Sequence, residues 1–409
     1  MSEKPAHIVI IGAGHAGGTA AALLRQYDFQ GPITLIGEEP IPPYQRPPLS
    51  KAWLKGEADA DSLALKPLEF YAENGVDFRP NVRVEAINRA DKTVSLSDGS
   101  TLAYDMAILA TGARPIRLSI PGADLAGVLE LRTASDAEAL KSALGPGKTV
   151  AIVGGGYIGL EAAASARSLG ADAIILEREG RILARVACET LSTFFQTYHE
   201  ARGVKFQLNA AATGFSGKDG KVTGVTLADG RSLACDLVLV GVGVVPNEEL
   251  AKAADLDCAR GVVVNLEART SDPSIFAIGD VALRPMPIYD RMFRMESVPN
   301  ALEQAKQVAC AITGRPAPAG ETPWQWSDQY DLKLQIAGYP FDADQILVRG
   351  DPAGNKFAIF HLKGDQLQSV EAINAPPEFM MGRQLIGNRK PVNASKLADT
   401  SISMKEVAA

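Results

Sequence analysis

Two short glycine-rich segments have the spacing needed to bind phosphate groups. The glycines are Gly12, Gly14 and Gly17 in the first segment and Gly154, Gly156 and Gly159 in the second. In such a GxGxxG segment the glycines allow a tight turn, close approach of the backbone to a pyrophosphate and close helix packing. The amides at the start of the following helix then face the phosphates. The predicted chemistry is the binding of a dinucleotide through its pyrophosphate.

Each glycine segment is followed by an acidic residue that is placed to bind a ribose. Glu38 lies 26 positions after Gly12, and Glu177 lies 23 positions after Gly154. At this spacing the carboxylate accepts hydrogen bonds from ribose hydroxyls. A single GxGxxG can be a structural turn, but two complete units predict two dinucleotides in one chain. One of them must then hand electrons to the other.

The elements that position these residues can be read on both sides of each glycine segment. A β-branched run precedes the glycines, a helical segment follows them, and a second apolar run leads to the acid. The predicted elements are strand 7–11, helix 18–25 and strand 33–36 in the first unit, and strand 149–153, helix 160–169 and strand 173–176 in the second. These βαβ units predict an α/β fold.

The segments after each βαβ unit follow the same order, a hairpin and then a buried strand, and the sequence pattern changes after Gly314. Segments 92–96 and 221–227 read as hairpin strands with Asp-Gly turns, and each is followed by a buried strand, 106–109 or 237–240. This near-repetition predicts two similar halves. After Gly314 a Pro- and Ala-rich stretch reads as a linker. Beyond it we expect four alternating strands, a helix at 376–385 and a loosely held tail after Pro391.

The composition is that of an ordinary globular protein of two or three domains. The chain has 409 residues, 46% hydrophobic and 22% charged, and 41 basic against 48 acidic residues give a net charge of −7. These values exclude collagen-like, disulfide-rich and wholly disordered proteins, and they argue against a nucleic-acid or membrane-surface binder. No segment has the pattern of a signal peptide or about 18 uninterrupted apolar residues, so we expect a cytoplasmic protein with no membrane span.

Cysteines and histidines show no metal-site pattern. The cysteines, at positions 188, 235, 258 and 310, are 47, 23 and 52 positions apart, without a CxxC pair. We therefore expect four reduced thiols and no metal. The histidines are scattered, and we expect packing or surface roles for His7, His15, His199 and His361.

Six motifs together resemble one enzyme family. They are GAGHAG at 12–17, RPPLSK at 46–51, ATGARP at 110–115, GGGYIGLE at 154–161, FAIGD at 276–280 and WSDQY at 326–330. The chain resembles, over nearly its whole length, the FAD-dependent pyridine-nucleotide oxidoreductases of the glutathione-reductase fold. Within them it is similar to the ferredoxin reductases that pass NADH electrons to [2Fe-2S] ferredoxins of monooxygenase and dioxygenase systems.

The resemblance implies two Rossmann-like dinucleotide-binding domains and a C-terminal α+β domain. The FAD-binding domain would comprise residues 1–113 and 248–319, the NAD-binding domain 114–247 and the C-terminal domain 320–409. It also implies the FAD-binding residues, which are Gly12, Gly14, His15, Ala16, Gly17, Glu38, Arg46, Lys51, Val84, Ala110, Thr111, Gly112, Arg132, Gly279, Asp280, Ser297, Val298 and Trp324. Among these, Asp280 would bind the ribityl chain and Trp324 would cover one flavin face.

The NAD-binding residues implied in the same way surround the second glycine segment. They are Gly154, Gly156, Tyr157, Ile158, Gly159, Glu177 and Gly243. A carboxylate at Glu177 accepts from a 2′-hydroxyl and repels a 2′-phosphate, which favours NADH over NADPH. The neighbouring Arg178 is basic and could accommodate a phosphate.

Two charged residues are the catalytic candidates. A cation near the flavin stabilises its reduced, negatively charged form, and Lys51 follows a rigid Pro-Pro segment. The resemblance pairs Lys51 with Glu161, which would fix the ammonium. No cysteine precedes Cys188, so the disulfide relay of related reductases is missing from the early segment where they carry it. Electrons must then leave to an outside one-electron acceptor.

The expected partner is an acidic [2Fe-2S] ferredoxin, which requires a local basic patch on this acidic chain. Candidates are Arg291, Arg294, Lys306, Arg315 and Lys333. Alternative functions are a rubredoxin reductase, an NADH oxidase, or a redox-sensing flavoprotein that resembles apoptosis-inducing factor. The oligomeric state is left open.

Overall fold

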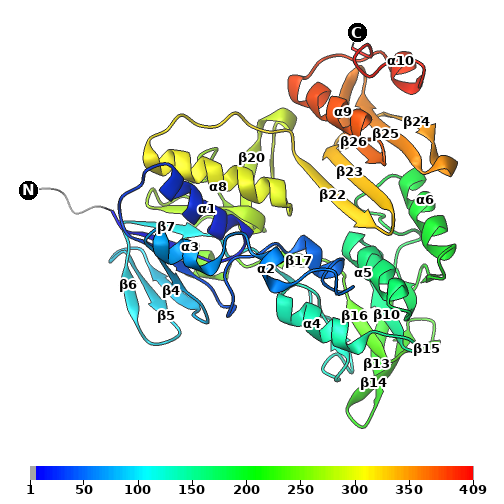
Figure 1. Cartoon of the computed structure of the whole chain (residues 1–409), viewed down its shortest axis with the longest axis horizontal. Helices are drawn as coiled ribbons and strands as arrows, with labels where there is room; N and C mark the ends of the chain where they lie inside the picture. The colour runs from blue at the N-terminus through cyan, green and yellow to red at the C-terminus, as the bar shows by residue number, and fades with distance from the viewer. Residues whose placement is uncertain (1–5, 409) are drawn as a thin grey trace, which may run out of the picture.

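The computed structural model describes residues 6–408, and its first large sheet contains the first glycine turn. This parallel sheet has the order β19-β7-β1-β2-β3. Its strands are β1 (Ile8–Ile11), β2 (Ile33–Ile36), β3 (Val76–Arg79), β7 (Met106–Leu109) and β19 (Ile275–Ala277). Strand β1 is apolar on both faces because both faces of the sheet are covered. Ile8 and Ile10 pack against α1 (His15–Gln26) and α8 (Val298–Thr313), which lie side by side (Figure 1). On the other face, Val9 and Ile11 pack against a small sheet of hairpin strands through Val84 and Val94.

The second parallel sheet repeats this plan. Its order is β12-β11-β10-β16-β9. The strands are β9 (Val128–Leu129), β10 (Thr149–Val153), β11 (Asp172–Leu176), β12 (Lys205–Gln207) and β16 (Leu237–Val240). Helix α5 (Tyr157–Ser168) connects β10 to β11, and its alanines 162–164 and 166 are buried. Both sheets therefore present a glycine turn at the carboxyl edge of a central strand, as the sequence predicted.

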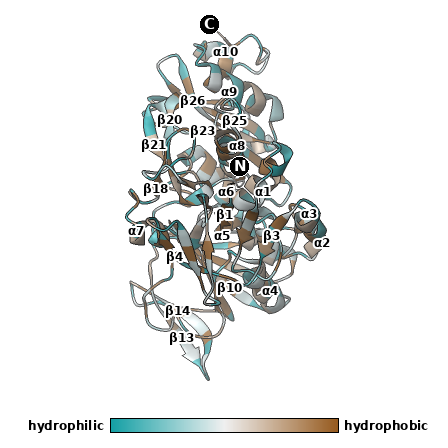
Figure 2. Ribbon diagram, turned by 90° about the vertical axis from the view of Figure 1, so that its left-hand side faces the viewer, coloured by the Kyte–Doolittle hydropathy of each residue, from teal (hydrophilic) through white to brown (hydrophobic). Residues whose placement is uncertain are grey.

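The third large sheet is antiparallel and lies at the C-terminal end of the chain. Its order is β22-β23-β26-β25-β24. The strands are β22 (Trp324–Gln329), β23 (Leu332–Gly338), β24 (Gln345–Asp351), β25 (Lys356–Lys363) and β26 (Gln366–Ile373), with α9 (Pro376–Asn388) packed on β26 and β23. Figure 2 shows apolar residues concentrated along the central strands of the molecule. The α/β class with an α+β C-terminal unit is confirmed.

Smaller elements complete the fold. Each expected hairpin has a third strand, in the sheets β4 (Val84–Asn88), β5 (Thr93–Leu96), β6 (Thr101–Ala103) and β13 (Ala212–Lys218), β14 (Lys221–Leu227), β15 (Ser232–Ala234). The other helices are α2 (Ala60–Leu63), α3 (Leu68–Glu73), α4 (Ala134–Ala143), α6 (Glu189–Glu200), α7 (Glu249–Ala253) and α10 (Ala394–Ala398). The short 3-10 helices are η1 (Pro47–Ser50), η2 (Gly279–Val281), η3 (Pro287–Tyr289) and η4 (Pro352–Gly354). A further small sheet contains β18 (Val262–Val263), β20 (Ala282–Met286) and β21 (Arg291–Phe293).

Two antiparallel strands carry the chain between the two parallel sheets. Strand β8 (Ala113–Pro115) pairs with β17 (Val244–Pro246). Beside them, Thr111 and Asn247 exchange two hydrogen bonds of 2.8 Å each. The segment that leaves the first parallel sheet and the segment that returns to it are thus hydrogen-bonded to each other. The predicted domain boundaries at 113 and 248 lie at these crossings and stay predictions.

The structure corrects two expectations about local elements. Helix α1 begins at His15 and α5 at Tyr157, three residues earlier than predicted, because each helix starts directly after its glycine turn. The tail after Pro391 is not loose. Leu397 and Val407 are buried, and the buried Arg349 donates hydrogen bonds to three tail carbonyls, those of Leu397, Asp399 and Ile402.

Within residues 6–408, none of the helices combines the length and the apolar character that crossing a bilayer requires.

Candidate functional site

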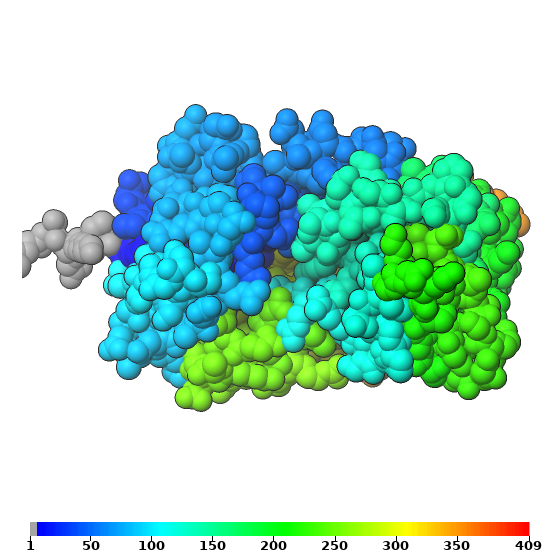
Figure 3. Space-filling model, turned by 90° about the horizontal axis from the view of Figure 1, so that it is seen from below, coloured from blue at the N-terminus to red at the C-terminus, as the bar shows by residue number. Residues whose placement is uncertain are grey.

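A large cavity lies where the three sheets approach one another. It has a volume of about 2070 Å³ and is lined from both glycine turns, from η1 and from β22. Figure 3 shows a hollow between the blue and cyan atoms of the first parallel sheet and the green atoms of the second. Drug-sized ligands occupy sites of roughly 300–1,000 Å³, so this cavity has room for two larger ligands.

The two glycine turns have nearly identical backbones. Gly12 and Gly154 both have φ of +113°, a conformation that side chains rarely adopt. A Cβ atom at Gly12 would lie 2.2 Å from the carbonyl oxygen of Ala110, and one at Gly154 would lie 2.4 Å from that of Gly241. The strand after each turn thus packs directly against it, which leaves space only for glycine.

The residues that begin each helix are open towards the cavity. A Cβ atom at Gly14 or Gly156 would meet no atom within 4 Å. Each of these glycines is the N-cap of its helix, and a glycine has no side chain that could accept from the first helical amides. The buried His15 Nδ1 atom also has no partner within the described residues, and burial lowers the pKa of this imidazole. Both observations fit a phosphate-bearing cofactor at the helix N-termini.

Most residues predicted to bind the two nucleotides line this cavity. The exceptions are Gly17, Gly154, Gly159 and Trp324. A Cβ atom at Gly17 would lie 2.0 Å from the Gly12 carbonyl oxygen, and one at Gly159 would lie 2.3 Å from that of Gly154. These two glycines therefore hold the helix against its turn instead of facing a ligand.

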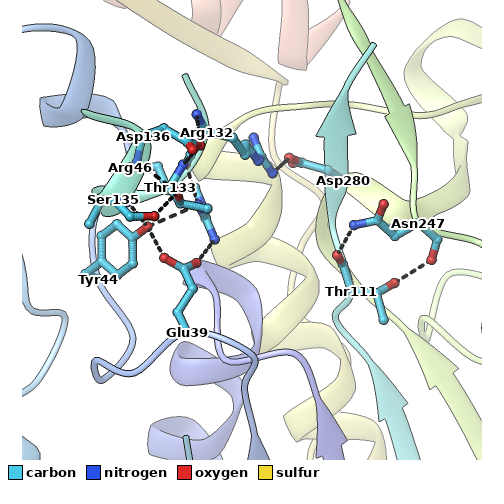
Figure 4. Close-up of polar contacts among 11 residues, drawn as sticks. Glu39, Tyr44, Arg46, Thr111, Arg132, Thr133, Ser135, Asp136, Asn247 and Asp280 are labelled. Carbon is cyan, nitrogen blue, oxygen red and sulfur yellow. Dashed lines mark hydrogen bonds and ion pairs between the residues drawn. The ribbon is translucent and has the colours of Figure 1, made fainter. Parts of the chain in front are cut away.

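Arginine side chains are held at the cavity wall by hydrogen bonds and ion pairs (Figure 4). Arg132 Nη2 lies 2.9 Å from Asp280 Oδ2. Arg46 donates to the carboxylate of Glu39 at 2.7 Å and to the carbonyl oxygen of Arg132 at 2.5 Å. Tyr44 donates to the same Glu39 carboxylate. Loop 39–46 therefore presents Arg46, and the segment that leads into α4 presents Arg132, on the same side of the cavity.

Glu161 connects all three parts of the molecule at the cavity. Its Oε2 atom lies 2.6 Å from Lys51 Nζ and accepts a 2.5 Å hydrogen bond from Ser50. Its Oε1 atom accepts a 2.6 Å hydrogen bond from Ser327 on β22. We call these four residues the Glu161 cluster. The Glu161 side chain is only 3% exposed, so its charge is buried and balanced by Lys51.

The hydrogen bonds continue from the Glu161 cluster into α6. Gln329 Nε2 donates to Ser327 Oγ at 3.0 Å, and Gln329 Oε1 lies 2.7 Å from His199 Nε2. Because an amide oxygen only accepts, the proton of the neutral His199 ring lies on Nε2. Burial lowers the pKa of His199 to about 4. Ser327 and Gln329 belong to the WSDQY motif, but the sequence predicts no role for either residue. His199, for which a packing or surface role is expected, is fully buried and is hydrogen-bonded to Gln329.

The two tryptophans of β22 occupy different places. Trp324 does not line the cavity, because its ring packs against Phe379 at 5.7 Å between centroids and lies under Arg383. Trp326, two residues later on the same face of the strand, does line it. Of the two rings, Trp326 lines the cavity, and the flavin contact expected of Trp324 stays a prediction.

The acids predicted to bind ribose both reach the cavity. Glu38 pairs with Arg83 at 3.0 Å in an exposed position. Glu177 accepts hydrogen bonds from the amides of Gly155 and Glu179, at 2.8 and 3.0 Å, which fix its carboxylate beside the second glycine turn.

The basic residues proposed for partner docking are mostly paired with acids. Arg291 pairs with Asp342, Arg294 with Glu296, and Arg315 with Asp28. Among the described residues only two of the five candidates, Lys306 and Lys333, are without an ion pair, and both are exposed. A common basic patch stays a prediction.

Comparison with known proteins agrees with this geometry. The family model for pyridine nucleotide-disulphide oxidoreductases matches residues 6–305, and the reductase C-terminal model matches residues 324–408. A probable ferredoxin reductase of Castellaniella defragrans is 51% identical over 98% of each chain. A rubredoxin-NAD(+) reductase of Pseudomonas putida is 40% identical over 90% of this chain and 96% of its own.

A solved structure has almost the same fold. It is the crystal structure of a covalent putidaredoxin reductase–putidaredoxin complex, with a TM-score of 0.96 and 40% identity over 98% of each chain. The two family models together cover nearly all described residues, and the relatives align from end to end. The chain therefore belongs to the pyridine nucleotide-disulphide oxidoreductases, in the ferredoxin-reductase branch that carries a reductase C-terminal domain.

Proposed function

We propose that this protein is an FAD-dependent NADH:ferredoxin oxidoreductase that supplies an oxygenase through an acidic [2Fe-2S] ferredoxin. The observation that carries the proposal is the Glu161 cluster. It places one buried ion pair, Lys51 with Glu161, in a cavity that is lined by both glycine turns. The family implies FAD and a reduced nicotinamide nucleotide as the two occupants. Relatives named as ferredoxin and putidaredoxin reductases support the acceptor class.

The residues of this chain hold the nucleotides and set the charge around them. Bound FAD supplies the conversion of a two-electron hydride donor into single electrons for a one-electron carrier. The helix N-termini after Gly14 and Gly156 would hold the two pyrophosphates. Lys51 brings a positive charge to the cavity wall, and the hydrogen bonds of Ser50 and Ser327 to Glu161 hold that charge in one place.

Electrons have no thiol relay to follow in the described part of the chain. The four cysteines are free, and only Cys188 lines the cavity. Its thiol donates to Glu371 Oε2 at 3.2 Å and not to a second cysteine. An outside one-electron carrier is therefore the acceptor that the site supports, and Trp326 places an aromatic ring on the cavity wall.

The preference for NADH rests on Glu177. Its carboxylate is fixed by two backbone amides and faces the cavity next to Gly156. A fixed negative charge repels a 2′-phosphate and accepts from a 2′-hydroxyl. Arg178 is turned to Glu179, 3.0 Å away, so its charge is already paired.

The experiment is the rate of NADH oxidation by the FAD-loaded protein with and without added [2Fe-2S] ferredoxin. We expect ferredoxin reduction well above the oxygen background, with a KM for ferredoxin that rises with salt because docking to an acidic partner is electrostatic. A rate that does not exceed the oxygen background would overturn the proposal and favour an NADH oxidase.

A rubredoxin reductase is the second candidate, because one relative at 40% identity carries that name. Rubredoxin in place of ferredoxin in the same assay separates the two functions. A higher kcat/KM with rubredoxin would favour the second candidate.

A further inference from the structure

A second polar cluster lines the cavity, and no hydrogen bond within residues 6–408 links it to the Glu161 cluster. Cys188 precedes α6, His361 lies on β25 and Glu371 lies on β26. The Cys188 Sγ atom and the His361 Nε2 atom each lie 3.2 Å from Glu371 Oε2. The three atoms lie within 4.8 Å of one another. The fold thus joins the NAD-binding half to the C-terminal sheet through these side chains.

These three side chains are a ligand set that zinc prefers. Zinc binds thiolate, imidazole and carboxylate at about 2.0–2.3 Å, which places ligand atoms in a tetrahedron about 3.3–3.7 Å apart. The two observed separations of 3.2 Å are close to that spacing. A thiolate and a carboxylate also balance a dication, so the complex is neutral and suits a buried place. His361 and Glu371 are both buried.

Ser369 provides an independent sign that a ligand belongs here. It faces His361 across the β25–β26 pairing, is 1% exposed and lines the same cavity. Its Oγ atom has no hydrogen-bond partner within the described residues. A buried hydroxyl normally has a partner, and a water on a bound ion would provide one.

We propose that Cys188, His361 and Glu371 form a three-ligand site for a divalent cation of the zinc class, with water as the fourth ligand near Ser369. On binding, the thiol gives its proton to solvent and a sulfur–metal bond forms, while the carboxylate and the neutral imidazole bind through lone pairs. No oxidation is involved. The ion would fasten the start of α6 to strands β25 and β26, beside the half-buried Tyr157 at the start of α5.

The test uses the untagged holoenzyme and zinc chloride. The protein is dialysed against chelator, equilibrated with zinc, desalted, and analysed for zinc per bound FAD by mass spectrometry. We expect about one zinc per chain in the unchanged protein and at least a tenfold loss in Cys188→Ser and His361→Gln. The matched controls Cys258→Ser and His7→Gln should keep the metal, since both residues lie outside the cluster.

A second measurement needs no substitution. Zinc should slow the alkylation of Cys188 by iodoacetamide, followed by peptide mass spectrometry, and leave the rate at Cys258 unchanged. Less than about a tenth of a zinc per chain, equal retention in Cys188→Ser, or an unchanged alkylation rate at Cys188 would each overturn the proposal.

Discussion

Lys51 Nζ lies 2.6 Å from Glu161 Oε2, although the two residues are 110 positions apart in the chain. Ser50 and Ser327 donate to the same carboxylate, from η1 and β22. A carboxylate buried in this way needs its cation, because an unpaired charge in a low-dielectric site is costly. The ion pair therefore stabilises the buried Glu161 carboxylate and also places the Lys51 charge on the cavity wall.

Replacing Lys51 with Met should slow reduction of the bound flavin by NADH about tenfold or more. The cation that stabilises negative charge in the cavity is removed, and each tenfold loss of rate corresponds to about 1.4 kcal/mol. Stopped-flow absorbance of the flavin measures the rate, and a redox titration measures the potential. Lys55→Met is the control, because Lys55 pairs with the exposed Glu57. Unchanged rate and potential in Lys51→Met would place this residue outside the reaction.

Replacing Gly14 with Ala should weaken FAD binding without unfolding the protein. The added methyl group meets no protein atom within 4 Å, and it occupies the space in front of the first helical amides. Gly12→Ala is the contrasting variant, since its Cβ would lie 2.2 Å from the Ala110 carbonyl oxygen. FAD content and circular dichroism distinguish the two. Full FAD retention in Gly14→Ala would mean that the pyrophosphate does not approach this turn.

Replacing Glu177 with Gln should lower the preference for NADH over NADPH. The side chain keeps an acceptor for the Gly155 or Glu179 amide but loses the charge that repels a 2′-phosphate. The ratio of kcat/KM for the two nucleotides measures the change, with the exposed Glu200→Gln as control. The same ratio in Glu177→Gln and the unchanged protein would remove Glu177 from nucleotide selection.

Acid should destabilise the folded protein partly through His199. Its folded pKa of about 4 lies below the ordinary value of 6.5, so the unfolded chain binds the proton more tightly. The contribution of the neutral His199 ring to the stability of the folded protein is complete above pH 6.5, and it is lost as the pH falls towards 4. From this group alone, the free energy of unfolding should be about 2 kcal/mol lower at pH 5 than at pH 7.

Denaturant unfolding of His199→Gln at both pH values checks this expectation. The variant keeps a donor for Gln329 but cannot titrate, so its loss of stability between pH 7 and pH 5 should be smaller by about the same 2 kcal/mol. His7→Gln serves as control, because His7 directly precedes β1 and its ring contacts Thr34, far from Gln329 in the chain. An equal pH dependence in His199→Gln and the unchanged protein would contradict the assignment.

Local spacing was enough to predict the two glycine turns, their acids and the α/β class. A strand, a tight turn and a helix are adjacent in the chain, so their geometry follows from neighbouring residues. The motifs also carried the resemblance to the family, and it was this resemblance, and not local spacing, that paired Lys51 with Glu161.

Contacts between distant segments needed the tertiary structure. Ser327 reaches Glu161 across 166 positions, and Cys188 reaches Glu371 across 183. Which of Trp324 and Trp326 lines the cavity depends on how β22 meets it, and the packed tail depends on the buried Arg349. Such contacts are decided by how separately folded sheets pack on one another, and the periodicity of a single segment carries no information about that packing.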